Sequence, residues 1–378
     1  MRWDRLTFGI GLSYALLAWS LGYGAVLPEL RDELHMSASV AAVHGSLFGV
    51  CLLVFAAFGS RFFAAVANRT VFALGVAGML GGGILFGLGR SVTLTLGGAG
   101  IAGAGAALLV IVVPSVVFLH QPDASTQAMS TLNAFPMASA TLLPIAVGAA
   151  LAGSITWRFA YLAPLLAIAI GVALATGRSP VPDGDVATPM ALSELFRIPQ
   201  FTKRWFALVC GVFVEIGTGI WAASIMRNEG GASKGLAATL TVGFFVGMAI
   251  GRVAISNLLR RFDGGAILMA SFIASAVALA PFLLGPGLPV RVFGLTLLGL
   301  ALSPVYPLSI ARMFALHHDT ATLGRAAALA SGVGVTAGPL LLGALSDHVG
   351  LRWATAVLPA FLLVGLLTIS ARRVSSIA

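Results

Sequence analysis

The chain has 378 residues, of which 58% are apolar and 9% are charged. Soluble domains carry about 25% charged residues, so these side chains are too few to cover a soluble chain of this length. The net charge of +9 would favour a nucleic-acid partner in a soluble protein, but Lys and Arg are scattered in ones and twos. The composition therefore predicts an all-α polytopic membrane protein in a lipid bilayer and excludes nucleic acid as a partner.

Catalytic and metal-binding motifs are missing from the sequence. Cys51 and Cys210 both lie in apolar runs and form neither a disulfide framework nor a CxxC metal pair. There is no HExxH helix or Walker loop. We expect no metal, no cofactor and no catalytic residue, so the chain is not predicted to be an enzyme. An intramembrane enzyme such as an acyltransferase is a remote alternative.

The first apolar run extends from Leu6 to Leu27. It is longer than the 7–15 residues of a signal-peptide core, and no cleavage site follows it, so we interpret it as a retained membrane helix. Apolar runs bounded by charges, Pro or Gly predict twelve spans in the whole chain. Their predicted bounds are 6–27, 39–62, 71–88, 93–118, 127–151, 157–177, 205–226, 235–259, 265–284, 289–316, 323–345 and 352–370.

The one long polar connection runs from Arg178 to Arg204 and contains four prolines. A polar, Pro-bearing segment near the centre of a chain is typical of a linker. We therefore expect an N-terminal six-helix half, 1–178, a central cytoplasmic linker, 179–204, and a C-terminal six-helix half, 205–378. Lys and Arg are about twice as frequent at the span ends on the linker side, which predicts an inner (plasma) membrane protein with both termini cytoplasmic.

Short matches indicate that the two halves repeat one another. The stretch PIAVGA at 144–149 is matched by PLLLGA at 339–344, 195 positions later. Arg158 opens the sixth span and Arg352 opens the twelfth, 194 positions later. A near-constant offset across separate span pairs favours a duplicated six-helix unit. Parallel repeats of this kind are related by an axis along the membrane normal.

The stretch FVEIGTGIW at 213–221 places Glu215 deep inside an apolar span, with the nearest charges 11 positions before it and 12 after it. That is near the middle of a hydrocarbon core of ~30 Å. A charged carboxylate there costs on the order of 2.5–3.5 kcal/mol, and intramembrane acids are functional by default. We predict that Glu215 couples transport to protons. Arg252 and Arg312 are the candidates for its counter-charge, although snorkelling to the interface is the more ordinary interpretation of both. A protonated glutamate bonded to a neighbouring helix is the structural alternative.

Four aromatic and hydroxyl side chains are candidate substrate contacts around that acid. Trp19 and Tyr23 lie four apart, which predicts that they stack on one face of the first span, and the repeat offset of 196 places Trp19 opposite Glu215. Thr218 and Trp221, at +3 and +6, are expected to continue the face of Glu215. An aromatic pair near a carboxylate suits a sugar or another amphipathic solute. Packed or lipid-facing aromatic rings are the alternative.

Further polar and proline residues complete the candidate site. Asn133 in the fifth span needs a partner if it is buried, and its amide can orient a substrate hydroxyl or join two helices. Tyr306 lies between Pro304 and Pro307, where proline predicts a kinked tenth span that contacts substrate or gates access. Arg252, toward the cytoplasmic side of the eighth span, is a second candidate for gating; interfacial snorkelling is its ordinary interpretation.

Twelve spans in two halves about a central linker resemble the major facilitator superfamily. The loop LRRFDG at 259–264 is similar to the superfamily's G-x-x-x-D-R-x-G-R-R loop, and the loop after the second span lacks its acidic residue. The stretches VEIG at 214–217 and LSPVYP at 302–307 are similar to the fucose and glucose/galactose–proton symporters. These symporters have a functional glutamate in span seven, and the resemblance implies the same role for Glu215.

The resemblance implies a secondary active transporter that works by alternating access. Its site would be lined by spans 1, 2, 4, 5, 7, 8, 10 and 11. We expect a monomer that moves a small polar or neutral organic solute, sugar-like solutes among them, together with protons. A proton-driven exporter of drugs or metabolites is the alternative, because such an antiporter also needs a titratable acid.

Overall fold

The computed structural model describes residues 1–177, 181–183, 192–316 and 320–369. Every regular element among these residues is a helix. Within the described ranges, twelve helical segments are long and apolar enough to cross a membrane. These observations confirm the predicted fold class, an all-α chain with twelve candidate membrane spans.

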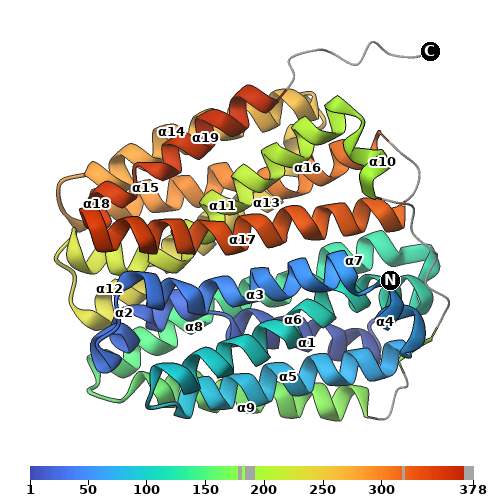
Figure 1. Cartoon of the computed structure of the whole chain (residues 1–378), viewed down its shortest axis with the longest axis horizontal. Coiled ribbons are helices and arrows are strands. Elements are labelled where there is room, and N and C mark those ends of the chain that lie inside the picture. Colours follow the sequence, from blue (N-terminus) through green and yellow to red (C-terminus); the bar gives the residue numbers. More distant parts are fainter. Residues whose placement is uncertain (178–180, 184–191, 317–319, 370–378) are drawn as a thin grey trace.

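The helices before the linker form the lower group in Figure 1. They supply the first six spans. Their bounds are α1 Arg5–Ser20, α2 Tyr23–Leu34, α3 Ala38–Phe58, α4 Ser60–Ala65, α5 Asn68–Leu88, α6 Val92–His120, α7 Ser125–Leu132, α8 Ala134–Ala152 and α9 Trp157–Thr176, with a short 3-10 turn, η1, at Pro122–Ala124.

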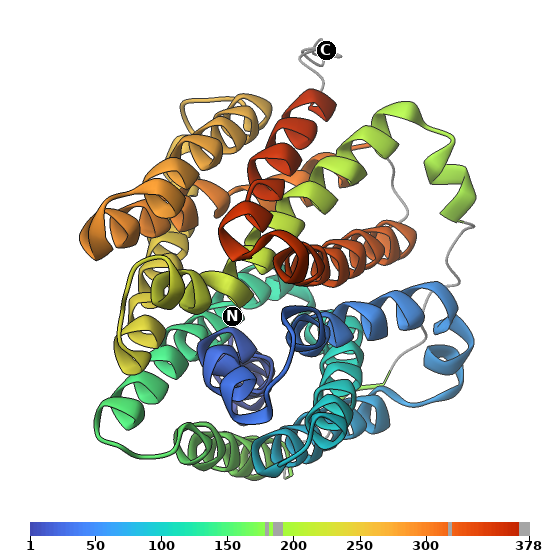
Figure 2. The same ribbon diagram turned by 60° about the vertical axis from the view of Figure 1, so that its left-hand side comes forward.

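The helices after the linker form the upper group, and Figure 2 shows the two groups facing each other. They supply the last six spans. Their bounds are α10 Leu192–Phe196, α11 Pro199–Asn228, α12 Lys234–Leu240, α13 Val242–Leu258, α14 Gly264–Leu284, α15 Gly287–Leu302, α16 Val305–Phe314, α17 Thr320–Val349, α18 Leu351–Ala354 and α19 Val357–Thr368.

The bundle has two distinct ends. The N-terminus, α4, α7 and α10 lie at one end, which we call the linker end, and α2, α12 and α18 lie at the other, which we call the far end (Figure 1). The seventh span begins at Pro199, inside the predicted linker of 179–204. Much of that linker, 179–180 and 184–191, lies outside the described residues. The predicted domain boundaries therefore stay a prediction.

Among the described residues, five spans consist of two helices rather than one. The first is broken at 21–22, the fifth at Asn133, the eighth at Thr241, the tenth at Ser303–Pro304 and the twelfth at 355–356. At four of the breaks a polar side chain donates to a carbonyl of the preceding turn, at 2.9 Å for Asn133, 2.7 Å for Thr241, 2.9 Å for Ser303 and 2.6 Å for Thr355. Such local bonds compete with the helix ladder and bend it. The kink predicted at Pro304 is confirmed.

Glycine allows the two groups to approach closely. A Cβ on Gly24 of α2 would lie 2.2 Å from the carbonyl oxygen of Gly219 in α11. A Cβ on Gly148 of α8 would lie 2.7 Å from the carbonyl oxygen of Gly235 in α12, and one on Gly343 of α17 would lie 2.7 Å from a backbone oxygen of α3. Small residues permit such backbone contacts between membrane helices. Three helix crossings therefore hold the groups together toward the far end.

Candidate functional site at the centre of the bundle

Glu215 lies near the middle of α11, a 30-residue helix. Its side chain is half-buried, and the residues just before it, Phe213 and Val214, are fully buried. Within the described part of the chain, the carboxyl group forms no hydrogen bond and no ion pair within 4 Å. A carboxyl group at this depth without a fixed partner is free to gain and lose a proton or to meet a ligand.

Two side chains interact electrostatically with Glu215, and two more are linked to it through one of them. Arg252 of α13 is its electrostatic partner, and Tyr306 of α16 interacts with both charges. The Tyr306 hydroxyl shares a hydrogen bond with Ser331 of α17 and interacts with Tyr14 of α1 in the other group. We call these five residues the central cluster. It brings together one acid, one base and three hydroxyl groups from both halves of the molecule.

Of the two arginines considered as counter-charge, the structure brings Arg252 to the acid. Arg312 lies elsewhere, because the Arg204 guanidinium donates a hydrogen bond to the Arg312 carbonyl oxygen at the linker end. Arg204 and Arg312 also line one small pocket there. Arg252 is thus placed to respond to the charge of Glu215, whereas Arg312 is not.

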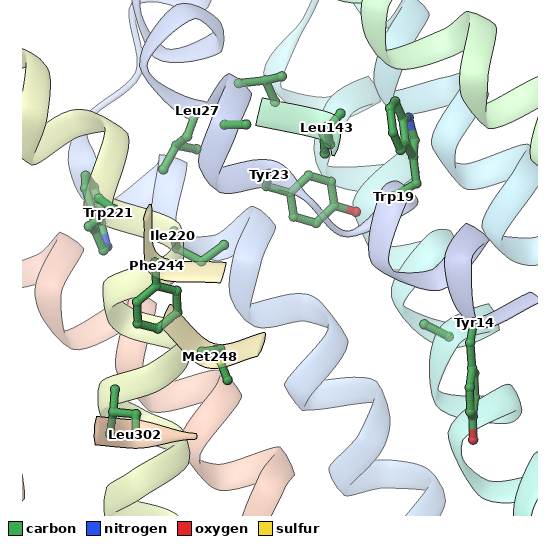
Figure 3. Packing of buried hydrophobic residues seen from close by; sticks show 14 of the residues in the cluster. Tyr14, Trp19, Tyr23, Leu27, Leu143, Ile220, Trp221, Phe244, Met248 and Leu302 are labelled. Carbon is green, nitrogen blue, oxygen red and sulfur yellow. The ribbon is translucent and has the colours of Figure 1, made fainter. Parts of the chain in front are cut away.

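Trp19 and Tyr23 do not form the expected stack. The Trp19 indole N–H donates to the Tyr161 carbonyl oxygen of α9 at 2.8 Å, and the Tyr23 ring packs on Phe86 with ring centroids 4.7 Å apart. The helix break at 21–22 falls between the two residues, so the four-residue spacing no longer places them on one face. Figure 3 shows the Tyr23 hydroxyl pointing in the direction of Trp19, and it has no hydrogen-bond partner in the described structure.

Trp221 does not continue the face of Glu215. Its indole N–H donates to the Pro339 carbonyl oxygen of α17 at 3.2 Å, and the ring is fully buried. Six positions on an α-helix correspond to a rotation of about 240°, which explains why Trp221 faces α17 while Glu215 faces Arg252. Thr218 is also fully buried, and its hydroxyl has no hydrogen-bond partner among the described residues.

The remaining candidates lie at the breaks of their spans. Asn133 is exposed, and its amide bonds the carbonyl oxygen of Met129 within its own span rather than another helix. Pro304 is the residue directly before α16, and Pro307 is exposed one turn later. These placements leave the proposed roles in substrate binding and gating untested.

An ion cluster at the far end, which the sequence analysis missed, joins the two groups. Arg227 of α11 contacts Glu29 at 3.1 Å and Asp32 at 2.6 Å, both on α2. Lys234 at the start of α12 contacts the other oxygen of Glu29 at 2.9 Å. We call these four residues the far-end ion cluster. The spacing of three between Glu29 and Asp32, which places both acids on one helix face, was the signal available in the sequence.

Asp347 makes a second polar connection between the groups at the far end. It lies near the end of α17 and accepts backbone N–H groups of Ala38 at 2.7 Å and Ser39 at 2.8 Å. These are unpaired donors at the N-terminus of α3, where a carboxylate is favoured by the helix dipole. The first turn of α3 is therefore capped by the other half of the molecule.

Twelve spans in two facing groups, with a titratable cluster shared between the groups, define a polytopic membrane transporter fold. The chain belongs to the Major Facilitator Superfamily, whose family model matches residues 7–229. This confirms the predicted family and supports a transporter rather than an enzyme. The resemblance to the fucose and glucose/galactose branch stays a prediction.

Solved structures agree on the fold. The nucleoside transporter NupG is similar with a TM-score of 0.78 at 12% identity, over 97% of this chain and 98% of that one. A bacterial homolog of the human lysosomal transporter Spinster, inward-facing and occupied, has a TM-score of 0.71 at 16% identity, over 96% of this chain and 95% of that one. The inward-facing, unoccupied structure of a bacterial Spinster homolog has a TM-score of 0.69 at 18% identity, over 98% of this chain and 97% of that one. A comparison with curated protein sequences gave no match.

Proposed function

We propose that the protein is a proton-coupled secondary active transporter of a small, hydroxyl-bearing organic solute, working as a monomer by alternating access. The single observation that carries this proposal is Glu215, an acid at mid-span that has no fixed partner in the described structure and is coupled to Arg252. Intramembrane acids of this kind mark proton and substrate pathways.

The coupling would work through the charge of Glu215. When the carboxyl group is ionised, Arg252 stabilises it; when it is protonated, that attraction is lost and the helices that carry the two residues, α11 and α13, are held together less strongly. A proton therefore binds the conformation with α11 and α13 apart more tightly than the conformation with these helices together. Such a difference in affinity is the condition for a shift in the populations of the two conformations. Each pH unit of gradient supplies about 1.4 kcal/mol per proton.

The substrate class follows from the chemistry of the central cluster. Tyr14, Tyr306 and Ser331 offer hydroxyl groups, and the two tyrosines also offer aromatic faces. A solute with several hydroxyl groups and a flat or ring-shaped apolar part can bond these groups and stack on the rings. Sugar-like solutes fit this description, and so does the nucleoside substrate class of the similar transporter NupG.

The far end would be the closed gate and face the outside. Glycine crossings and the far-end ion cluster join the groups there. At the linker end, Arg325 of α17 bonds the carbonyl oxygens of Ala56 and Ala57 in α3 at 3.2 and 3.5 Å. The Lys and Arg bias predicts that the linker end lies in the cytoplasm, and the Arg325 bonds would then have to break for the transporter to open inward.

The proposal is tested in two steps. A thermal-shift screen of the purified protein against sugars, nucleosides and organic acids identifies the ligand, because a ligand that binds the folded state raises the melting temperature. Proteoliposomes with an imposed pH gradient then measure uptake of that ligand. We expect accumulation with the gradient and simple equilibration after a proton ionophore. Accumulation that persists without any proton gradient would refute proton coupling, and proton flux opposite to the solute would identify an exporter.

A further inference from the structure

We propose that a crevice between α1, α8 and α9 is a binding site for a lipid acyl chain. The crevice has a volume of about 510 Å³, and nine of its ten lining side chains are apolar. Small-molecule pockets are typically 300–1,000 Å³, so the space is large enough for an extended guest. Ala15 and Trp19 line it from α1, Pro164 and Ile168 from α9, and α8 supplies the rest.

The crevice is continuous with the lipid-facing surface of the bundle. Leu142 and Ile145 of α8 line it and are 55% and 42% exposed. On α9, Leu166 and Ile170 are exposed as well. Large apolar side chains exposed at mid-span of a membrane protein face hydrocarbon. The crevice therefore opens sideways into the bilayer.

The depth of the crevice determines which part of a lipid can enter it. Trp19 lies at the middle of the first span, Arg5–Leu34, and Pro164 near the middle of the sixth, Trp157–Thr176. Along α8 the lining runs from Phe135 to Ala146, which is roughly 16 Å at 1.5 Å per residue. At mid-depth of a bilayer the available molecules are the terminal parts of acyl chains.

The chemistry of the lining excludes other occupants. Among the described residues, no charged side chain lines the crevice, and Ser139 is the single polar side chain in the lining. A polar solute would lose its hydrogen bonds to water without replacing them, and apolar cavities stay dry and accept apolar guests. A hydrocarbon chain therefore matches the lining, whereas a headgroup or the transported solute does not.

Trp19 gives the crevice a fixed wall. The ring is 4% exposed, and its N–H is already bonded to the Tyr161 carbonyl oxygen, so its apolar face is what remains for a guest. Trp19 is also the second-last residue of α1, directly before the break in the first span. A bound chain would thus contact the hinge of a span that also carries Tyr14 of the central cluster. This site does not depend on Glu215.

The test uses fluorescence quenching by bromine in nanodiscs. Phosphatidylcholine brominated near the chain end is compared with the unbrominated lipid, and the Trp19 signal is taken as wild type minus Trp19→Phe. We expect Trp19 to lose most of its emission in brominated lipid. Trp221, enclosed between α11 and α17, is the internal control and should keep its emission.

A matched pair of variants on α8 shows where the quencher sits. Ala138→Phe fills the crevice, whereas Ala149→Phe places the same side chain at an exposed position outside it. Ala138→Phe should abolish quenching of Trp19 and Ala149→Phe should preserve it. Equal Trp19 emission in both lipids, quenching that survives Ala138→Phe, or strong quenching by aqueous iodide would each overturn the proposal. If Ala138→Phe fails to fold, the comparison of Trp19 with Trp221 decides it.

Discussion

Replacing Gly24 by Ala tests whether the far end is a gate closed by backbone contact. In this structure the new methyl group would lie 2.2 Å from the Gly219 carbonyl oxygen and 3.1 Å from the Ile220 Cα. Ordinary contacts begin at 3.4 Å, so α2 and α11 would have to separate by about 1 Å. Because the opposing atoms belong to the backbone, a side-chain rotation cannot relieve the clash.

The expected size of the effect follows from the cost of overpacking. Inserting a methyl group into a tightly packed site costs about 1–3 kcal/mol, and each 1.4 kcal/mol is a factor of ten in an equilibrium. Gly24→Ala should therefore disfavour the far-end-closed conformation by roughly 5- to 150-fold relative to conformations in which α2 and α11 are apart. The variant should populate a conformation that is open at the far end.

The assay is a distance measurement by pulsed electron spin resonance between labels on the two groups. Ile155→Cys and Arg352→Cys are suitable sites, because both residues are exposed and lie at the far end. Gly24→Ala should add a longer distance to the distribution. Gly219→Ala is the matched control: it lies at the same crossing, but its Cβ would meet nothing within 4 Å. Identical distributions for the two variants would refute the argument.

Three further predictions concern single contacts. Arg227→Gln should lower the melting temperature more than Lys234→Gln, because Arg227 is 23% exposed and contacts Asp32 at 2.6 Å, while Lys234 is 55% exposed and reaches Asp32 only at 4.0 Å. Exposed pairs contribute about 0.2–1 kcal/mol, and equal shifts would contradict this. Trp221→Phe removes the indole hydrogen bond to the Pro339 carbonyl oxygen, which keeps its helical partner inside α17. The lost bond should reduce the free energy of unfolding by about 0.5–1.5 kcal/mol, as measured by denaturant titration. Arg252→Lys should retain pH-driven uptake that Arg252→Gln loses, and equal uptake by both would remove Arg252 from the coupling.

The spans could be predicted from the sequence because hydropathy alone determines them. Every predicted run corresponds to a helical segment that can cross a membrane. The breaks were harder to predict. The break at Pro304 can be predicted because proline has no backbone N–H for the helix ladder. At Thr241 and Asn133 the break accompanies a side-chain hydrogen bond to the preceding turn. Many Thr and Asn residues in helices do not make this bond.

The candidate site was predictable only in part. Glu215 stands out because a charge in hydrocarbon has a large energetic cost. Tyr14 has no such signal, since a tyrosine in an apolar run is ordinary, and only the approach of α1 to α16 brings it to Tyr306. The pairing of Arg227 with Glu29 joins residues 198 positions apart. Local spacing cannot predict such contacts. It also gave a wrong prediction for Trp19, which does not stack on Tyr23 because the helix breaks two residues after Trp19.

The most direct test of the central claim is the proton flux that accompanies solute movement in proteoliposomes that contain Glu215→Gln. The matched control is Glu229→Gln, at the end of the same helix. Glu215→Gln should exchange labelled solute across the membrane while moving no protons and accumulating no solute against a gradient, and Glu229→Gln should behave like wild type. Gradient-driven accumulation with unchanged proton stoichiometry in Glu215→Gln would contradict the proposed role of this acid.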